Sequence, residues 1–323
     1  MKRRLGCAGI VAIVVAGIAF FVLLQQWAGA GPLARNTTIE IAPGTGVAAA
    51  AQQLENAGAI PSASRFKLFA RAFGGGTGIK AGEYRIPAHL SQADILKLLQ
   101  GGRTLQRFVT IPEGWPSVMV RDALMKAQGL NGQVAVPVEG TILPDSYSFQ
   151  RGDTRAEMVT RMQRAMTRYL AAAWEKRKPG IAVTTPRDAL ILASIVEKET
   201  GKDSERRTVA AVYSNRLKRG MPLQADPTVI YPVTKGRPLG RRILRSELQN
   251  DNGYNTYAKT GLPVGPIANP GRASIDAVLD PAQSSALYFV ADGTGGHVFA
   301  DTLEQHNANV QKWYAIRRAR GEM

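Results

Sequence analysis

The chain opens with an uncharged run from Leu5 to Leu24 that follows the basic cluster Lys2-Arg3-Arg4. About twenty apolar or small residues are enough for a helix to cross the hydrocarbon core of a bilayer. Because basic residues beside a membrane span favour the cytoplasmic side, the pattern predicts a cytoplasmic tail at residues 1–4 and a transmembrane anchor at residues 5–27. We then expect the rest of the chain outside the cytoplasmic membrane.

A cleaved signal peptide is the alternative interpretation of this run, since Ala28-Gly29-Ala30 resembles a cleavage site. The apolar stretch is longer than the core of an ordinary signal peptide, so we favour a retained anchor. Trp27 suits the membrane–water interface. Residues 28–36 are predicted to form a short linker.

Residues 37–111 are predicted to form a small α+β unit, because short alternating segments are mixed with capped helical ones. The expected elements are a strand at 37–41, helices at 47–57 and 62–73, a strand at 82–86, a helix at 92–100 and a strand at 105–111. The strand–helix–helix–strand order is similar to a LysM-type glycan-binding module. A plain spacer domain is the alternative.

The fold class expected for the whole exported part is α+β. Residues 112–153 are rich in Pro and Gly and are predicted to connect the first unit to a mainly helical domain at residues 154–323. In that domain we expect helices at 155–176, 186–200, 205–219 and 303–318, and a C-terminal hairpin with strands at 287–291 and 297–300.

The helix bounded by Thr185 and Gly201 places one carboxylate among apolar residues. With about 100° of rotation per residue, Glu199 falls on the same face as Leu192 and Ile195. A carboxyl group pressed against a core loses hydration, so its pKa is expected to rise. A raised pKa lets a carboxylic acid donate a proton at neutral pH, which makes Glu199 the candidate catalytic acid.

Two alternatives remain open for this helix. Its last turn can fray into solvent, in which case Glu199 only pairs with a neighbouring Lys or Arg. Glu197 points to nearly the opposite side of the helix and is the fallback acid if the helix phase differs by half a turn.

The loop-rich region 221–271 is too rich in aromatic and rigid residues to be disordered. Tyr, Asn and Gln side chains combine flat apolar surface with hydrogen-bonding ends, a combination that suits sugars. The candidate substrate contacts are Tyr254, Asn255 and Tyr257, followed by Gln224 and Asp226. Each tyrosine by itself is more simply explained as a half-buried packing residue, and Asp226 before Pro227 as a turn former.

The composition of the chain limits the cofactors and binding partners to be expected. The formal net charge is +16, with a single cysteine, Cys7, so no disulfide framework can form. His89, His297 and His306 lack metal-ligand spacing, so we expect neither a metal nor a cofactor. A basic exported chain is expected to meet anionic lipid headgroups and peptidoglycan carboxylates rather than nucleic acid, although a solvated surface without a specific partner is an equal alternative.

Several motifs in order resemble the MltG (YceG-like) endolytic murein transglycosylases over residues 37–323. The motifs are PEGW at 112–115, EGTILPDSYSF at 139–149, IVEKET at 195–200, LQADPTVIY at 223–231, YNTY at 254–257, GLPVGPIANPG at 261–271 and YFVADGTGGHVF at 288–299.

The resemblance implies a single-pass inner-membrane protein with a LysM-like unit and a lytic transglycosylase domain. It implies cleavage of the β-1,4 bond between N-acetylmuramic acid and N-acetylglucosamine in nascent peptidoglycan. The strands would end in 1,6-anhydro-muramic acid, which terminates their elongation. It also implies that Glu199 is the catalytic acid and that the protein associates with peptidoglycan synthases.

Three rival functions remain at this level. A basic nucleic-acid binder would require the chain to lie in the cytoplasm. A lysozyme-like muramidase would use Asp226 as the second carboxylate that hydrolysis normally requires. A catalytically silent glycan-binding scaffold would need no acid at all, and the placement of Glu199 on an apolar face argues against it.

Overall fold

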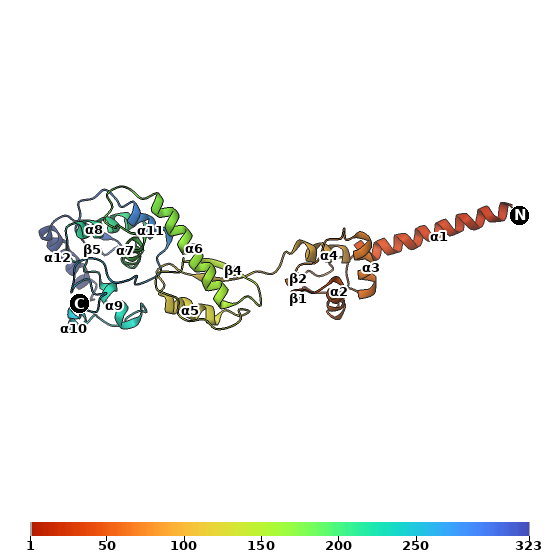
Figure 1. Cartoon of the computed structure of the whole chain (residues 1–323), viewed down its shortest axis with the longest axis horizontal. Coiled ribbons are helices and arrows are strands. Elements are labelled where there is room, and N and C mark those ends of the chain that lie inside the picture. Colours follow the sequence, from red (N-terminus) through yellow and green to blue (C-terminus); the bar gives the residue numbers. More distant parts are fainter. Residues whose placement is uncertain (1, 323) are drawn as a thin grey trace. The chain divides into compact units, whose positions relative to one another are not determined.

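The structure is a computed structural model that describes residues 2–322, and for residues 2–10 only the helical backbone. The chain forms two compact units, Met1–Arg107 and Phe108–Met323, each described by itself (Figure 1). The predicted basic tail at residues 2–4 and Cys7 lie outside the residues whose side chains are described.

Helix α1 (Lys2–Ala28) is the N-terminal apolar helix. Its segment Val11–Ala28 has a mean hydropathy of 2.1, and only 6% of that segment is buried. By length and composition this helix can cross a membrane, although a signal sequence would meet the same two conditions. Within the described residues, α1 is the one helix that does so.

Trp27 at the end of α1 is buried in the first unit, with 7% of its surface exposed. Its ring centroid lies 5.2 Å from that of Phe69 and 5.8 Å from that of Phe66. The expectation that Trp27 sits at a membrane interface is therefore wrong in this structure. The indole instead packs its apolar rings against two phenylalanines.

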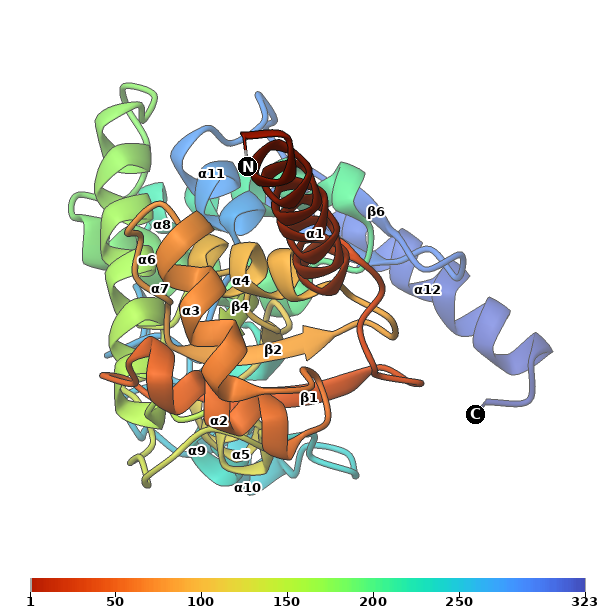
Figure 2. The same cartoon turned by 90° about the vertical axis from the view of Figure 1, so that its right-hand side faces the viewer.

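The first unit is a two-stranded antiparallel sheet covered by helices. Strand β1 (Thr37–Ile41) pairs with β2 (Gly82–Ile86), with Ile39 opposite Tyr84 (Figure 2). The helices are α2 (Val47–Asn56), α3 (Ala63–Phe73) and α4 (Gln92–Gly101). The predicted strand–helix–helix–strand order is confirmed, whereas the LysM-like character of the unit stays a prediction.

The second unit begins with a small sheet of its own. Strand β3 (Arg107–Ile111) pairs with β4 (Asp145–Phe149), and α5 (Ser117–Lys126) lies between them in the chain. The strand expected at 105–111 therefore forms, but it belongs with β4 rather than with β1 and β2. The segment 112–153, expected to be only a connector, carries a helix, a strand and part of a core.

That core explains why the connector folds. Val120 and Leu124 of α5 are fully buried with Ile142, and Met158 of the next helix packs into the same cluster. The Pro and Gly residues of this segment mark turns between these apolar positions rather than a flexible linker.

The remaining elements build the larger part of the second unit around α7. They are α6 (Arg155–Glu175), α7 (Pro186–Glu199), a 3₁₀ turn (Asp203–Glu205), α8 (Arg206–Lys218), α9 (Asp226–Thr234), α10 (Arg245–Gln249), α11 (Arg272–Leu279), β5 (Tyr288–Ala291), β6 (His297–Ala300) and α12 (Leu303–Ala319). Helix α7 contacts α6, α8, α9 and α11. Its Leu192, Ile195 and Val196 are fully buried.

The helix starts predicted at 155 and 186 and the C-terminal hairpin are confirmed. Thr154 and Glu157 form the capping box of α6, and the Thr185 side chain accepts a hydrogen bond from the Asp188 N–H at the start of α7. Strands β5 and β6 pair antiparallel, with Phe289 opposite Phe299. The region 221–271, expected to be loop-rich, instead contains helices α9 and α10, so that expectation is wrong there.

A buried asparagine connects three distant loops of the second unit. The Asn269 side chain is fully buried and its Oδ1 accepts from the Ile142 N–H at 3.0 Å. Its Nδ2 donates to the Trp115 carbonyl at 2.9 Å and to Ser117 Oγ at 3.1 Å. A buried amide with so many bonded partners is expensive to remove, because each partner would lose its hydrogen bond without regaining water.

We expect Asn269→Ala to lower the free energy of unfolding by about 2–4 kcal/mol, because polar groups on two other loops lose their partner. Chemical denaturation of the full chain in detergent measures this. Asn307→Ala, at an exposed position of α12, is the control and should change stability by less than about 0.5 kcal/mol. If Asn269→Ala changed the stability as little as the control, the hydrogen bonds of Asn269 would not hold these loops together.

Candidate active site

Glu199 ends α7 and faces a polar pocket of the second unit. The pocket has a volume of about 280 Å³. Its lining residues come from α7, α8, the start of α9, β5, α12 and two loops: Glu199, Tyr213, Arg216, Leu223, Gln224, Asp226, Tyr257, Phe289 and His306. Glu199, Gln224, Asp226 and Tyr257 were singled out from the sequence, and the fold brings these four together.

Burial sets the acidity of Glu199. Packing of α7 removes water from the carboxyl group, and the nearby negative charge of Asp226 adds to this effect. Together they raise the pKa of Glu199 to about 7. The expected direction of the shift is confirmed, and its main cause is the desolvation that the helix pattern predicted.

Asp226 and Tyr257 form a direct pair at the mouth of the pocket. The Tyr257 hydroxyl donates to Asp226 Oδ1 at 2.6 Å. Burial, followed by this hydrogen bond, raises the pKa of Tyr257 above its ordinary value. Tyr257 therefore stays a neutral donor, and Asp226 stays exposed to solvent beside the desolvated acid.

Two buried threonines fix the positions of Asp226 and Tyr257 relative to each other. Thr228 Oγ1 and Thr256 Oγ1 lie 2.9 Å apart, and both side chains are fully buried. Thr256 Oγ1 also accepts from the Ala225 N–H at 3.0 Å. The threonines thus fasten the Asp226 loop to the Tyr257 loop, a role that sequence reasoning missed.

Arg216 is a buried cation that organises the floor of the pocket. Its guanidinium donates to the carbonyls of Leu287 at 2.6 Å and Leu223 at 2.9 Å, and to Gln224 Oε1 at 3.3 Å. Burial lowers the pKa of Arg216. Sequence reasoning missed this residue because an arginine in the last turn of a helix ordinarily points to solvent.

Tyr213 and His306 complete the pocket and were also missed. Burial, and then the charge of Glu199, hold the pKa of the Tyr213 hydroxyl well above its usual range. Burial lowers the pKa of His306, so its imidazole tends to be neutral. Within residues 2–322, His306 Nδ1 is buried without a hydrogen-bond partner.

Gln224 adopts the left-handed backbone conformation, with φ of 53°. Non-glycine residues rarely do so, and the strain is offset by the hydrogen bond from its N–H to the Thr256 carbonyl at 3.1 Å. This conformation turns the exposed Gln224 side chain toward Arg216.

Tyr254 and Asn255 do not line this pocket. The Asn255 side chain is fully buried, and its Nδ2 donates to three carbonyls of its own loop, those of Glu247, Leu248 and Asn250. Tyr254 packs against Tyr231, with ring centroids 4.9 Å apart. In this conformation the Asn255 amide is occupied within its own loop. Both residues stay predicted substrate contacts, with Tyr254 half-buried outside this pocket.

Glu197 points away from the pocket. Its Oε2 accepts from the Gly271 N–H at 3.0 Å, and its charge contributes, after burial, to raising the pKa of Glu113. A carboxylate that holds a backbone N–H in place serves a structural purpose. The helix phase that puts Glu199 on the core side is confirmed.

The tip of the β5–β6 hairpin rests on the chain just after Glu199. A Cβ on Gly201 would come within 3.0 Å of the Gly295 carbonyl oxygen, so a larger residue would push the two segments apart. Lys202 Nζ donates to Thr294 Oγ1 at 2.9 Å, and Glu205 pairs with His297 at 2.8 Å. Among residues 11–322, whose side chains the structure describes, no group of three His, Cys, Asp or Glu side chains is placed to hold a metal ion.

The fold and the pocket define a protein with an N-terminal apolar helix and a site built on a single desolvated acid. Residues 39–312 match the YceG-like family. The chain belongs to this family, which confirms the resemblance drawn from its motifs.

Relatives with assigned names share most of the chain. An endolytic murein transglycosylase of Bacillus subtilis is 30% identical over 313 residues, which cover 86% of this chain and 85% of that protein. One from Streptococcus pneumoniae is 30% identical over 322 residues, 84% of this chain and 57% of that longer protein. The 2.6 Å crystal structure of a YceG-like protein from Listeria monocytogenes superposes with a TM-score of 0.54 at 29% identity, covering 85% of this chain and 98% of that one.

We expect Glu199→Gln to stabilise the protein at pH 8 by on the order of 1–3 kcal/mol and to have little effect near pH 4. The folded chain binds this proton more tightly than the unfolded chain, where a Glu titrates near pH 4.3. Stability is therefore lost as the pH rises from there to about 7. Gln mimics the protonated acid and removes that loss.

Chemical denaturation at pH 4, 6 and 8 measures the effect. Glu175→Gln, at an exposed position of α6, is the matched control and should show no such trend. If Glu199→Gln changed stability equally at all three pH values, the carboxyl group would not be desolvated in the folded protein.

Proposed function

We propose that the chain is an endolytic lytic transglycosylase of peptidoglycan. It cleaves the β-1,4 bond between N-acetylmuramic acid and N-acetylglucosamine in nascent strands and leaves 1,6-anhydro-muramic acid ends. The observation that carries the proposal is Glu199, whose pKa of about 7 lets it act as an acid and then as a base at neutral pH. The names of the curated relatives support the substrate.

One acid suffices for this reaction because no water has to be activated. Protonated Glu199 gives its proton to the glycosidic oxygen as the bond to C1 breaks. The carboxylate so formed takes the proton from the 6-hydroxyl group of the same muramic acid, and that oxygen attacks C1. The proton count balances, and Glu199 ends the cycle as it began. General acid–base catalysis of this kind contributes about 10²–10⁴-fold in rate.

The neighbours of Glu199 suit the positive charge that develops at C1. The exposed Asp226 carboxylate stabilises it electrostatically, while the Tyr257 hydroxyl keeps that carboxylate in place at 2.6 Å. The side chain of Gln224 offers an amide for the acetamido group or ring hydroxyls. The substrate's own N-acetyl group can shield C1, so no protein nucleophile is needed.

Location follows from the same proposal. The apolar helix α1 would anchor the chain in the inner membrane, with the N-terminus in the cytoplasm and the second unit in the periplasm, where peptidoglycan is made. The first unit would act as a LysM-like glycan-binding module. Association with peptidoglycan synthases would bring the site to new strands and let cleavage end their elongation.

We expect Glu199→Gln to abolish release of anhydro-ended strands from purified peptidoglycan, a loss of at least about 10²-fold. Glu197→Gln is the matched control two residues away. Its amide oxygen can still accept from the Gly271 N–H, so activity should stay within a few-fold of the parent. Mass spectrometry of the released strands by the full chain in detergent measures both. Activity lost only in Glu197→Gln would overturn the assignment.

The rival muramidase would use Asp226 as its second carboxylate and produce reducing muramic acid ends, each one water heavier than an anhydro end. We expect anhydro ends from the parent. We also expect Asp226→Asn to move the alkaline limb of the activity profile to lower pH, because removing a nearby negative charge lowers the pKa of Glu199. Reducing ends from the parent, or complete loss of cleavage in Asp226→Asn, would favour the rival.

A further inference from the structure

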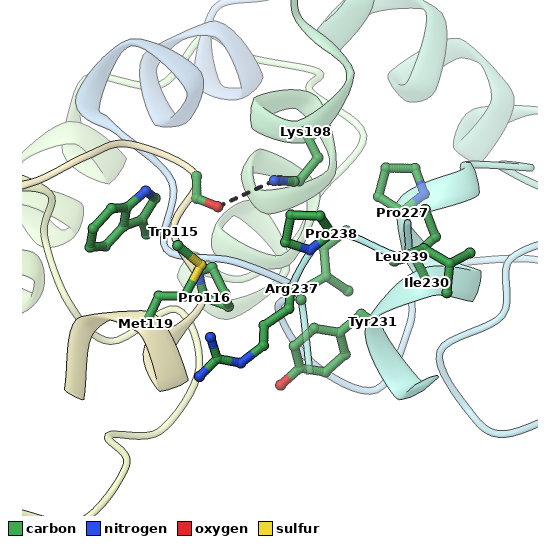
Figure 3. Close-up of a pocket in the computed structure, with 13 residues that line it drawn as sticks. Trp115, Pro116, Met119, Lys198, Pro227, Ile230, Tyr231, Arg237, Pro238 and Leu239 are labelled. Carbon is green, nitrogen blue, oxygen red and sulfur yellow. Dashed lines mark hydrogen bonds between the residues drawn. The ribbon is translucent and has the colours of Figure 1, made fainter. Parts of the chain in front are cut away.

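A second cavity of about 430 Å³ lies beside the Glu199 pocket in the same unit. Most of its wall is apolar and includes Trp115, Met119, Ile230 and Leu239 (Figure 3). Two cationic side chains, Lys198 and Arg237, join this wall. The mechanism proposed above uses none of these residues.

The two cavities share their boundary. Lys198 lines the apolar cavity while the next residue, Glu199, lines the polar pocket. In the same way Asp226 lines the pocket and Pro227 lines the apolar cavity. Consecutive Cα atoms are 3.8 Å apart, so the end of α7 and the start of α9 form a thin wall between the cavities. A branched ligand held at Glu199 can reach across it.

The two cationic side chains at the apolar cavity differ in whether they already have an acidic partner. Arg237 is paired with Asp122 at 2.5 Å. The exposed Lys198 donates one long hydrogen bond to the Gly114 carbonyl oxygen at 3.5 Å (Figure 3), and it forms no ion pair with a carboxylate among the residues whose side chains are described. Lys198 is therefore free to bind an anionic group at the edge of an apolar surface.

We propose that this cavity binds the peptide branch of the glycan substrate, a short chain that carries alanine methyl groups and free carboxylates and is joined to the lactyl group of muramic acid. Methyl groups of the branch fit the apolar wall, and one of its carboxylates pairs with Lys198. A bare sugar offers neither a chain of methyl groups nor a negative charge. Each extended residue spans about 3.3–3.6 Å, so the first two residues of the branch bridge from Glu199 to this cavity. The inference rests on the proposed function, since the muramic acid must lie at Glu199.

The test compares two substrates with the full chain in detergent. One is uncrosslinked glycan strands that carry their peptides, and the other is the same strands after an amidase has removed the peptides. The measured quantity is kcat/KM for release of anhydro ends. We expect the parent to prefer the peptide-bearing strands by about tenfold, as one charge-assisted contact allows.

Two variants change the cavity in different ways. Lys198→Gln removes the charge, and Leu239→Trp fills the apolar space from a surface loop. Each is expected to reduce the preference to about threefold or less. Because the preference is a ratio, an indirect effect on Glu199 cancels. Lys178→Gln, an identical change at an exposed position outside both cavities, should keep the preference of the parent.

The outcomes separate the inference from the function on which it rests. A parent without preference, or variants that lower both substrates equally, would overturn the peptide site while leaving the transglycosylase intact. Equal loss on both substrates would assign the cavity to the sugar path instead. A parent that releases no anhydro ends from either substrate would overturn the proposed function and the inference together.

Discussion

The desolvation of one carboxyl group at the end of α7 is the constraint on which the site depends. Helix α7 is packed on several sides by other helices, and its apolar residues are fully buried up to Val196. The half-buried Glu199 follows that face into a polar pocket, where loss of water raises its pKa to about 7. The same burial makes the folded state less stable once Glu199 ionises, and this is a cost that a catalytic acid commonly imposes on its fold.

The loops around α7 carry most of the positioning. Thr228 and Thr256 join two motifs that are far apart in the chain and bring Asp226 against Tyr257. Asn269 does the same for loops on the other side of the unit. These residues contribute no chemistry of their own, but buried hydrogen bonds between loops limit how far a substrate-facing side chain can drift.

The sequence pattern predicted those elements correctly that depend on interactions between residues close together in the chain. The cap at Thr185, the capping box at Thr154 and the hairpin at the C-terminus all depend on residues within a few positions of one another. The prediction was wrong for the segment 112–153, which contains part of a buried core rather than only turns. It was also wrong for Trp27, whose aromatic partners lie on another helix. In both cases the deciding contacts join residues that are distant in the sequence.

The amino-acid sequence by itself determined the apolar N-terminal helix, the phase of α7 and therefore the identity of the buried acid, because helical periodicity is a local property. Only the tertiary structure decided which polar residues meet that acid. Gln224, Asp226 and Tyr257 line the pocket, whereas the Asn255 side chain bonds within its own loop. Arg216 also lines the pocket, although nothing in the sequence of its helix predicted this. The physical reason is that a loop's direction follows from its long-range hydrogen bonds, which no short pattern of residues records.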